Sequence, residues 1–256
     1  EGRPAGEIVM NDYARDGSGN KIVSANGIYS IDPQKTIEAG NVLPKMFGGL
    51  LSDLYYKNFD LRIGMDYKYG GTIFSYTNNR LTGDGQLAST LQYRDQEHGG
   101  LAYYIDNSGK KIATTHNAAA PPASADGKVY HDGLILPGVM DDGTGKYVKN
   151  TTIASATDYY ESYANDLASS FPPDHLYKNN YIKLREVALA YTLPKSLASR
   201  LKMQGITLTL AGRNLFYIYK SIPNIDPESA IGADQFVENT IYPSQRTFSA
   251  GVNVAF

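Results

Sequence analysis

The stretch Gln245-Arg-Thr-Phe-Ser-Ala-Gly-Val-Asn-Val-Ala-Phe256 decides the fold class, because its apolar residues fall on every second position. Successive side chains of a strand point to opposite faces, so one face would carry Phe248, Ala250, Val252, Val254 and Phe256. Strands of soluble domains usually stop near five or six residues, whereas a tilted strand needs about 9–11 to cross a hydrocarbon layer. The stretch therefore predicts a long strand with one apolar and one polar or small-residue face, as a bilayer requires.

The segment Phe59–Tyr69 repeats this pattern after a two-residue turn at Lys57-Asn58. Its apolar face would hold Phe59, Leu61, Ile63, Met65, Tyr67 and Tyr69. The opposite face holds Asp60, Arg62, Gly64, Asp66 and Lys68. Four charges on one face are too many for a soluble core but suit a water-filled barrel interior.

Two further strands are predicted at Tyr181–Leu193 and Gly205–Tyr217. In the first, Val187, Leu189 and Tyr191 alternate with Glu186, Ala188 and Ala190. Pro194 stops this strand, and Lys195–Lys202 supplies one or two helical turns before the return strand. With a strand before Lys57, the five strands fall into the hairpins 48–69 and 181–217 and the terminal strand 244–256.

The remaining segments are predicted to be loops: 1–47, an outer loop or hairpin segment whose tight turn is Arg15–Asn20, then 70–180 and 218–243. The longest of them is predicted to contain short helices at Leu87–Arg94 and Thr157–Ser169 and a hairpin turn at Asp141–Gly145. Short and long connections alternate, as in outer-membrane barrels with brief periplasmic turns and large outer loops. Five strands cannot close on themselves, so we expect an all-β chain that forms part of a larger transmembrane barrel.

Composition narrows the function. The net charge of −2, with charges interspersed along the chain, argues against a nucleic-acid partner. The absence of Cys removes thiol nucleophiles and thiolate metal sites. The excess of tyrosine, 21 Tyr with no Trp, suits aromatic girdles at a membrane interface or loops that contact a ligand.

Several short motifs carry a family resemblance. They are Gly40–Lys45 followed by Gly48-Gly-Leu50, then Tyr56–Leu61, Tyr69-Gly-Gly71, Tyr181-Ile-Lys-Leu-Arg-Glu-Val187, Ala190–Lys195, Gly212-Arg-Asn-Leu-Phe216, Asp226-Pro-Glu228 and Arg246-Thr-Phe248. In this order they resemble the carboxyl-terminal part of SusC/RagA-family TonB-linked outer-membrane transporters. Segments 1–39 and most of 72–175 match only loosely, as outer loops that vary with substrate would.

The resemblance implies a 22-stranded barrel plugged by an amino-terminal domain, of which this chain would hold the last five strands. It implies location in the outer membrane of a Gram-negative, Bacteroidetes-like cell. It further implies a SusD-like surface lipoprotein as a lid, contact with the TonB complex through a part of the receptor outside this chain, and uptake of oligosaccharides or peptides. No cofactor is implied.

Two groups of side chains are candidates for contact with a substrate. The first group consists of charged side chains expected on the barrel interior: Arg62, Asp66, Lys68, Glu186 and Arg213. They either line the substrate route or pair with the plug and with each other, and both interpretations stay open. Loop tyrosines either stack on a sugar ring or pack within the loop or against the lid: Tyr159, Tyr160, Tyr163 and Tyr177. Phe256, as an aromatic carboxyl terminus, is expected to act in barrel assembly.

Catalysis and metal binding are disfavoured. His98, His116, His131 and His175 show no ligand spacing. Asp174-His175 near Ser169 and Ser170 has the residue types of a hydrolase triad but no Gly-x-Ser-x-Gly elbow. The alternative from another class is a soluble β-rich carbohydrate-binding or adhesin domain, which would partition into the aqueous phase rather than with detergent.

Overall fold

The computed structural model describes residues 2, 4–165, 173–229 and 236–256. The chain forms two compact units. The sheet unit comprises 1–7, 40–75 and 177–256, and the loop unit comprises 8–39 and 76–176.

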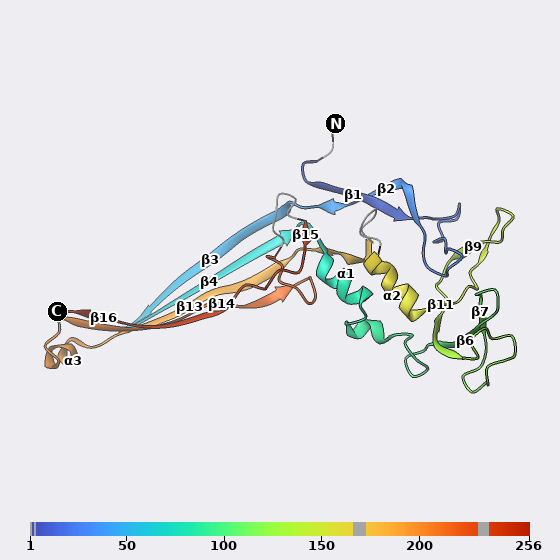
Figure 1. The fold of residues 1–256 in the computed structure, drawn as a ribbon. Helices are drawn as coiled ribbons and strands as arrows, with labels where there is room; N and C mark the ends of the chain where they lie inside the picture. Colours follow the sequence, from blue (N-terminus) through green and yellow to red (C-terminus); the bar gives the residue numbers. More distant parts are fainter. Residues whose placement is uncertain (1, 3, 166–172, 230–235) are drawn as a thin grey trace. The chain divides into compact units, whose positions relative to one another are not determined.

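The sheet unit is built on a five-stranded antiparallel sheet with the order β16-β14-β13-β4-β3 (Figure 1). Its strands are β3 (Pro44–Tyr56), β4 (Phe59–Gly70), β13 (Tyr181–Thr192), β14 (Gly205–Lys220) and β16 (Thr247–Ala255). These are the five strands that the alternating pattern predicts, with β3 beginning four residues earlier and β14 ending three residues later than expected. The helix α3 (Lys195–Arg200) forms the predicted reversal after Pro194.

The pairing register gives the sheet two unlike faces. Leu189 pairs with Leu61 on one side and with Leu210 on the other, and Leu210 pairs with Ala250. One residue along, Ala190 pairs with Asp60 and Thr209. Side chains of directly paired residues share a face, so the apolar positions of neighbouring strands meet in one apolar face, and the charged positions meet in one charged face.

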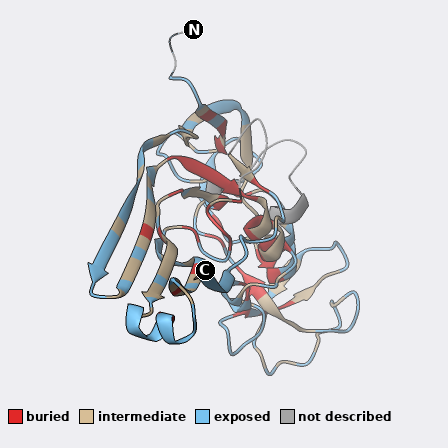
Figure 2. Cartoon of the chain, turned by 90° about the vertical axis from the view of Figure 1, so that its left-hand side faces the viewer, coloured by how far each residue is buried: buried red, intermediate tan, exposed pale blue. Residues whose placement is uncertain are grey.

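The strands of the sheet are mostly pale blue and tan in Figure 2, because few of their residues are buried. The apolar face is among the exposed parts of the sheet. Leu210 is 61% exposed, Val252 66% and Phe248 75%. Contiguous exposed apolar surface on this scale marks contact with lipid or with another protein.

Near the loop ends of its strands, the sheet unit continues into a smaller three-stranded sheet with the order β12-β5-β15. These strands are β5 (Thr72–Ser75), β12 (Leu176–Lys178) and β15 (Val237–Glu238). Gly70 and Gly71 allow the chain to leave β4 for β5, because both have left-handed φ values, 81° and 82°, that other residues rarely adopt. Ile73, Ile222 and Ile225 form the local core.

The loop unit is folded rather than irregular. It contains the pair β1 (Glu7–Tyr13) and β2 (Ile31–Asn41), the hairpin β9 (Val139–Asp141) and β10 (Tyr147–Lys149), and the sheet β11-β8-β6-β7. The strands of that sheet are β6 (Leu101–Ile105), β7 (Lys111–Ala113), β8 (Tyr130–Leu134) and β11 (Ala154–Ser155). Its helical segments are α1 (Tyr76–Gly83), η1 (Ala88–Leu91), α2 (Ala156–Asn165) and η3 (Pro173–His175).

Some local predictions for the loop unit are confirmed and others are wrong. The Asp141–Gly145 turn joins β9 to β10 as predicted. The helix predicted from Thr157 is α2, which Ser155 caps by accepting a hydrogen bond from the Asp158 N–H at 3.0 Å; the predicted end of this helix at Ser169 lies outside the described residues. The helix predicted at Leu87–Arg94 is only the short 3-10 turn η1, and α1 and β2 were not predicted.

Candidate functional site

A β-bulge in β13 brings two cations to one place on the charged face. Leu184 pairs with Met65 and Glu186 pairs with Gly64, so Arg185 is an extra residue in the ladder. Such a bulge re-aims side chains and interrupts regular pairing. The adjacent strand is irregular at the same level, where Asn214 has a left-handed φ of 52°. Lys183 and Arg185 consequently both reach one acidic segment of the 221–244 loop.

Glu228 is the acceptor at which these cations meet. Its Oε2 accepts hydrogen bonds from the Lys183 ammonium at 2.7 Å and from Arg185 Nη1 at 2.9 Å. Its Oε1 accepts from the Tyr181 hydroxyl at 3.0 Å and from Arg185 Nη2. Arg185 therefore grips the carboxylate at two points, the geometry in which guanidinium–carboxylate pairs are strongest.

Asp226 ties the same loop to β14 and to the residues that precede β16. It accepts hydrogen bonds from the Tyr217 hydroxyl, from the Ser244 amide at 2.8 Å and from the Ser244 hydroxyl at 2.7 Å. The Glu228 amide also donates to it at 3.0 Å. Both ends of the loop are thereby held to one carboxylate.

We call this group the loop anchor: Lys183, Arg185 and Tyr217 on the sheet with Asp226, Glu228 and Ser244 on the loop. The centre of the loop anchor is shielded from solvent, since Lys183 is 1% exposed. The Lys183 ammonium also donates to Ser244 Oγ at 2.7 Å and lies 4.6 Å from the centre of the Tyr217 ring. A buried ammonium needs partners of this kind, because an unpaired buried charge costs several kcal/mol, about 3–5.

Electrostatics keep both loop carboxylates ionised. Burial by itself would raise the pKa of Asp226, but hydrogen bonds from Tyr217, Glu228 and Ser244 outweigh it and lower the pKa to about 2. Burial likewise opposes ionisation of Glu228, and the hydrogen bonds and charges of Arg185 and Lys183 lower its pKa below the ordinary value. The anchor is thus charged at neutral pH, and its cations are engaged by carboxylates of the same chain.

The predicted interior charges lie on one face, and most of them are paired. Arg62 Nε lies 2.7 Å from Asp53 Oδ1, and Arg213 Nε lies 3.3 Å from Glu186 Oε2. Asp66 accepts a hydrogen bond from Arg185 Nε. Lys68 pairs in register with Tyr181 at the loop end of the charged face. Arg62, Asp66, Glu186 and Arg213 are thus each ion-paired within the chain, and both hypotheses, the substrate route and charge pairing, stay predictions.

The candidate tyrosines are largely packing residues. Tyr160 is 9% exposed in the core of the loop unit, where its hydroxyl donates to the Ser89 and Gln92 carbonyls, both at 3.2 Å. Tyr159 packs against the same core. Tyr177 packs against the isoleucine core of the sheet unit. The side chain of Tyr163 lies outside the described residues.

The histidines form no metal centre among the described residues, where no group of three potential ligands occurs. His116 and His131, which show no ligand spacing in the sequence, have stacked rings with their Nδ1 atoms 3.0 Å apart. His175 is buried, and burial lowers its pKa to about 4. Ser169 and Ser170 lie outside the described residues, so no triad geometry is defined. In the described part of the chain, no helix is long and apolar enough to span a membrane.

Lys183 and Arg185, the central cations, were missing from the sequence-based candidates. A signal existed, because the motifs Tyr181–Val187 and Asp226-Pro-Glu228 carry complementary charges. Only the fold shows that these two motifs meet.

Comparison with known proteins agrees with this architecture. The chain is 24% identical over 243 residues to the TonB-dependent receptor P3 of Formosa agariphila, covering 91% of this chain and 18% of that protein. The RagAB peptide importer in its open-open state matches with a TM-score of 0.50 and 17% identity over 98% of this chain. The fold is that of a SusC/RagA-type TonB-dependent outer-membrane receptor. The closed-closed RagAB state gives a TM-score of 0.49 at 17% identity over 97% of the chain.

The chain is a β-barrel portion of the receptor fold, and this fold assigns it to the outer membrane. It spans about a fifth of its relatives, 18% of the curated receptor and 23% of the solved importer chain. These relatives are named as a receptor and an importer, not as enzymes. No family model matches the chain.

Proposed function

We propose that this chain forms the last five strands of a 22-stranded barrel in a TonB-dependent importer that carries oligosaccharides or peptides across the outer membrane. The apolar face contacts lipid, and the charged face lines the barrel interior. The TonB complex acts through parts of the receptor outside this chain, and a SusD-like surface lipoprotein covers the barrel from outside.

The observation that carries the proposal is the loop anchor on the charged face. A barrel of this width needs internal structure to avoid an open pore. The 221–244 loop supplies part of it, because Glu228 and Asp226 fix it to β13 and β14 by five hydrogen bonds from Tyr181, Lys183, Arg185 and Tyr217. In this role the loop narrows the substrate route through the barrel and thereby selects which substrates pass.

A soluble carbohydrate-binding or adhesin domain fits less well. Such a domain would have to cover the apolar face with a second layer, yet Phe248 and Val252 remain exposed within the sheet unit. Peptide is the substrate class that we favour over oligosaccharide, because the solved neighbour with the TM-score of 0.50 is named a peptide importer.

Uptake by the full-length receptor tests this function. Cells that lack the receptor gene are complemented with the wild-type gene and supplied with a labelled peptide mixture or labelled oligosaccharides, with TonB present or deleted. We expect receptor-dependent and TonB-dependent uptake of peptides. Uptake that is unchanged when TonB is deleted contradicts the proposal, as does a receptor that fractionates as a soluble protein.

A further inference from the structure

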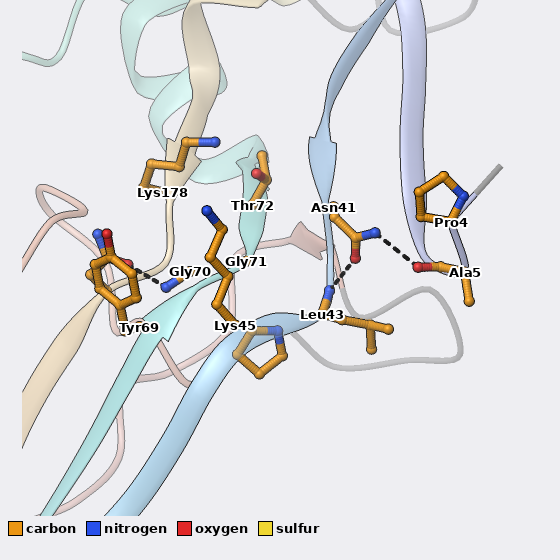
Figure 3. A pocket seen from close by; sticks show the side chains of 12 residues that line it. Pro4, Ala5, Asn41, Leu43, Lys45, Tyr69, Gly70, Gly71, Thr72 and Lys178 are labelled. Atoms are coloured by element: carbon orange, nitrogen blue, oxygen red, sulfur yellow. Dashed lines mark hydrogen bonds between the residues drawn. The ribbon is translucent and has the colours of Figure 1, made fainter.

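A pocket of about 600 Å³ lies at the loop ends of β3 and β4 in the sheet unit (Figure 3). It is separate from the loop anchor. Its lining residues are Pro4, Ala5, Asn41, Leu43, Pro44, Lys45, Tyr69, Gly70, Gly71, Thr72, Lys178 and Asn180.

The walls of the pocket are held by hydrogen bonds of the chain to itself. Asn41 donates its side-chain amide to the Ala5 carbonyl at 2.8 Å and accepts from the Leu43 amide at 2.8 Å. Asn180 accepts from the Gly70 amide at 2.7 Å. These polar groups already have hydrogen-bond partners within the chain, so they fix the shape of the pocket rather than bind a ligand. The pocket is preformed, which lowers the entropic cost of binding.

The charge of the pocket is positive. Lys45 and Lys178 are its charged lining residues, and within the described ranges no Asp or Glu lines it. Neither ammonium makes a hydrogen bond or an ion pair with any described residue, and both side chains are exposed. Figure 3 shows both amines beside Thr72. Two lysines without carboxylate partners provide a site for an anion, and lysine binds phosphate as a point charge.

The pocket adjoins the apolar face, because Tyr69 is one of its lining residues. Tyr69 lies on this face because β4 alternates regularly from Phe59, and it pairs with Met46 of β3. Tyr69, Met46 and the pocket residue Leu43 are all about half exposed, at 53%, 51% and 52%. An anion bound between the lysines would therefore lie next to apolar surface. This combination suits an amphipathic ligand rather than a sugar.

The position of the pocket along the membrane normal agrees with a membrane interface. Phe59 and Tyr69 stand at the two ends of the apolar face of β4, ten residues apart. At about 3.4 Å per residue and a tilt of about 40°, they are separated by about 26 Å along the membrane normal. The apolar band of a transmembrane barrel is about 25 Å tall with aromatic residues at both margins. Phe59 packs on Tyr191 at one margin, with ring centres 4.6 Å apart, and Tyr69 marks the other.

We propose that the pocket binds the phosphate of an anionic lipid headgroup from the surrounding leaflet, with Lys45 and Lys178 on the phosphate and the acyl chains along Met46 and Tyr69. This inference rests on the membrane placement of the proposed function and not on the transported substrate. A lipid held there would seal the wall where β4 gives way to β5.

Lipid retention by the purified full-length receptor tests the site. The receptor is incubated with mixed micelles that contain phosphatidylglycerol or phosphatidylcholine of identical acyl chains, and native mass spectrometry counts the lipids retained. We expect preferential retention of phosphatidylglycerol. Lys45→Ala with Lys178→Ala should lower it at least fivefold, and the double arginine variant should keep it. Lys128→Ala with Lys146→Ala, two exposed lysines of the loop unit, is the matched control and should change nothing.

Three outcomes overturn the assignment. If the double alanine variant retains as much phosphatidylglycerol as the wild-type receptor, the lysines hold no lipid. Equal retention of the two lipids shows that charge does not select the ligand. Lysine-dependent binding of inorganic phosphate without retained lipid assigns the pocket to a soluble phosphate compound. Uptake by the wild-type receptor is measured in parallel, so absent transport with lysine-dependent lipid retention refutes the proposed function and leaves the lipid site standing.

Discussion

Arg185 and Glu228, 43 residues apart in sequence, form a two-point ion pair that joins strand β13 to the 221–244 loop. Arg185 also donates to Asp66 of β4, so one guanidinium connects two strands and a loop. We expect this pair to set whether the loop stays against the charged face.

Glu228→Gln in the full-length receptor should release the loop. The change keeps the size of the side chain but removes the charge that Lys183 and Arg185 share, and hydrogen bonds to charged groups contribute about 1.5–3 kcal/mol each. Amide hydrogen exchange within 221–229 and 236–244 should rise by at least tenfold. Asp53→Asn is the matched control, because its partner Arg62 is 49% exposed and such pairs contribute only about 0–1 kcal/mol. Equal exchange in wild type and Glu228→Gln would show that the ion pair does not hold the loop.

Acid should release the same loop. The folded-state pKa of Asp226, about 2, lies below its ordinary value of 3.8, and that of Glu228 is lowered as well. A carboxyl with a depressed folded-state pKa contributes stability that is fully present above its ordinary pKa and is lost as the pH falls toward the folded-state pKa. The loop should therefore remain protected from about pH 5 to 8 and become exposed between about pH 4 and 2. Pepsin digestion of the assembled receptor across this range measures the release. Asp226→Asn should be cut more readily even at pH 4, and a cleavage profile that matches wild type would contradict the mechanism.

The strands could be predicted from sequence, whereas the contacts that organise the site could not. A period of two residues is local, so the faces of β4 and β16 follow from the sequence alone. The bulge at Arg185 and its bond to Glu228 depend on which strands become neighbours. The strand β2 was missed because Pro33 and Gly40 are unfavourable in strands. The helix α1 was missed because its Thr and Asn residues have low helix propensity; Asn78 and Asn79 are buried there, so packing stabilises what propensity does not.

Leu189 and Ala190 test the assignment of the faces, because they are adjacent in β13 and point to opposite faces at the same depth. Leu189 lies between Leu61 and Leu210, and Ala190 lies between Asp60 and Thr209. The cost of an arginine on the lipid face is about 2–4 kcal/mol at the bilayer midplane and falls toward the interfaces, whereas an arginine in the barrel interior meets water or polar groups. Leu189→Arg should therefore lower the unfolding free energy of the full-length receptor in bilayers more than Ala190→Arg. The pair Leu208→Arg and Thr209→Arg repeats the test on β14, where Leu208 pairs with Tyr191 and Val252 and Thr209 pairs with Ala190 and Gly251. Denaturant titrations in lipid vesicles give the four values. If the two substitutions of each pair lower the unfolding free energy equally, or if Ala190→Arg is the more destabilising, both the register and the membrane placement are wrong.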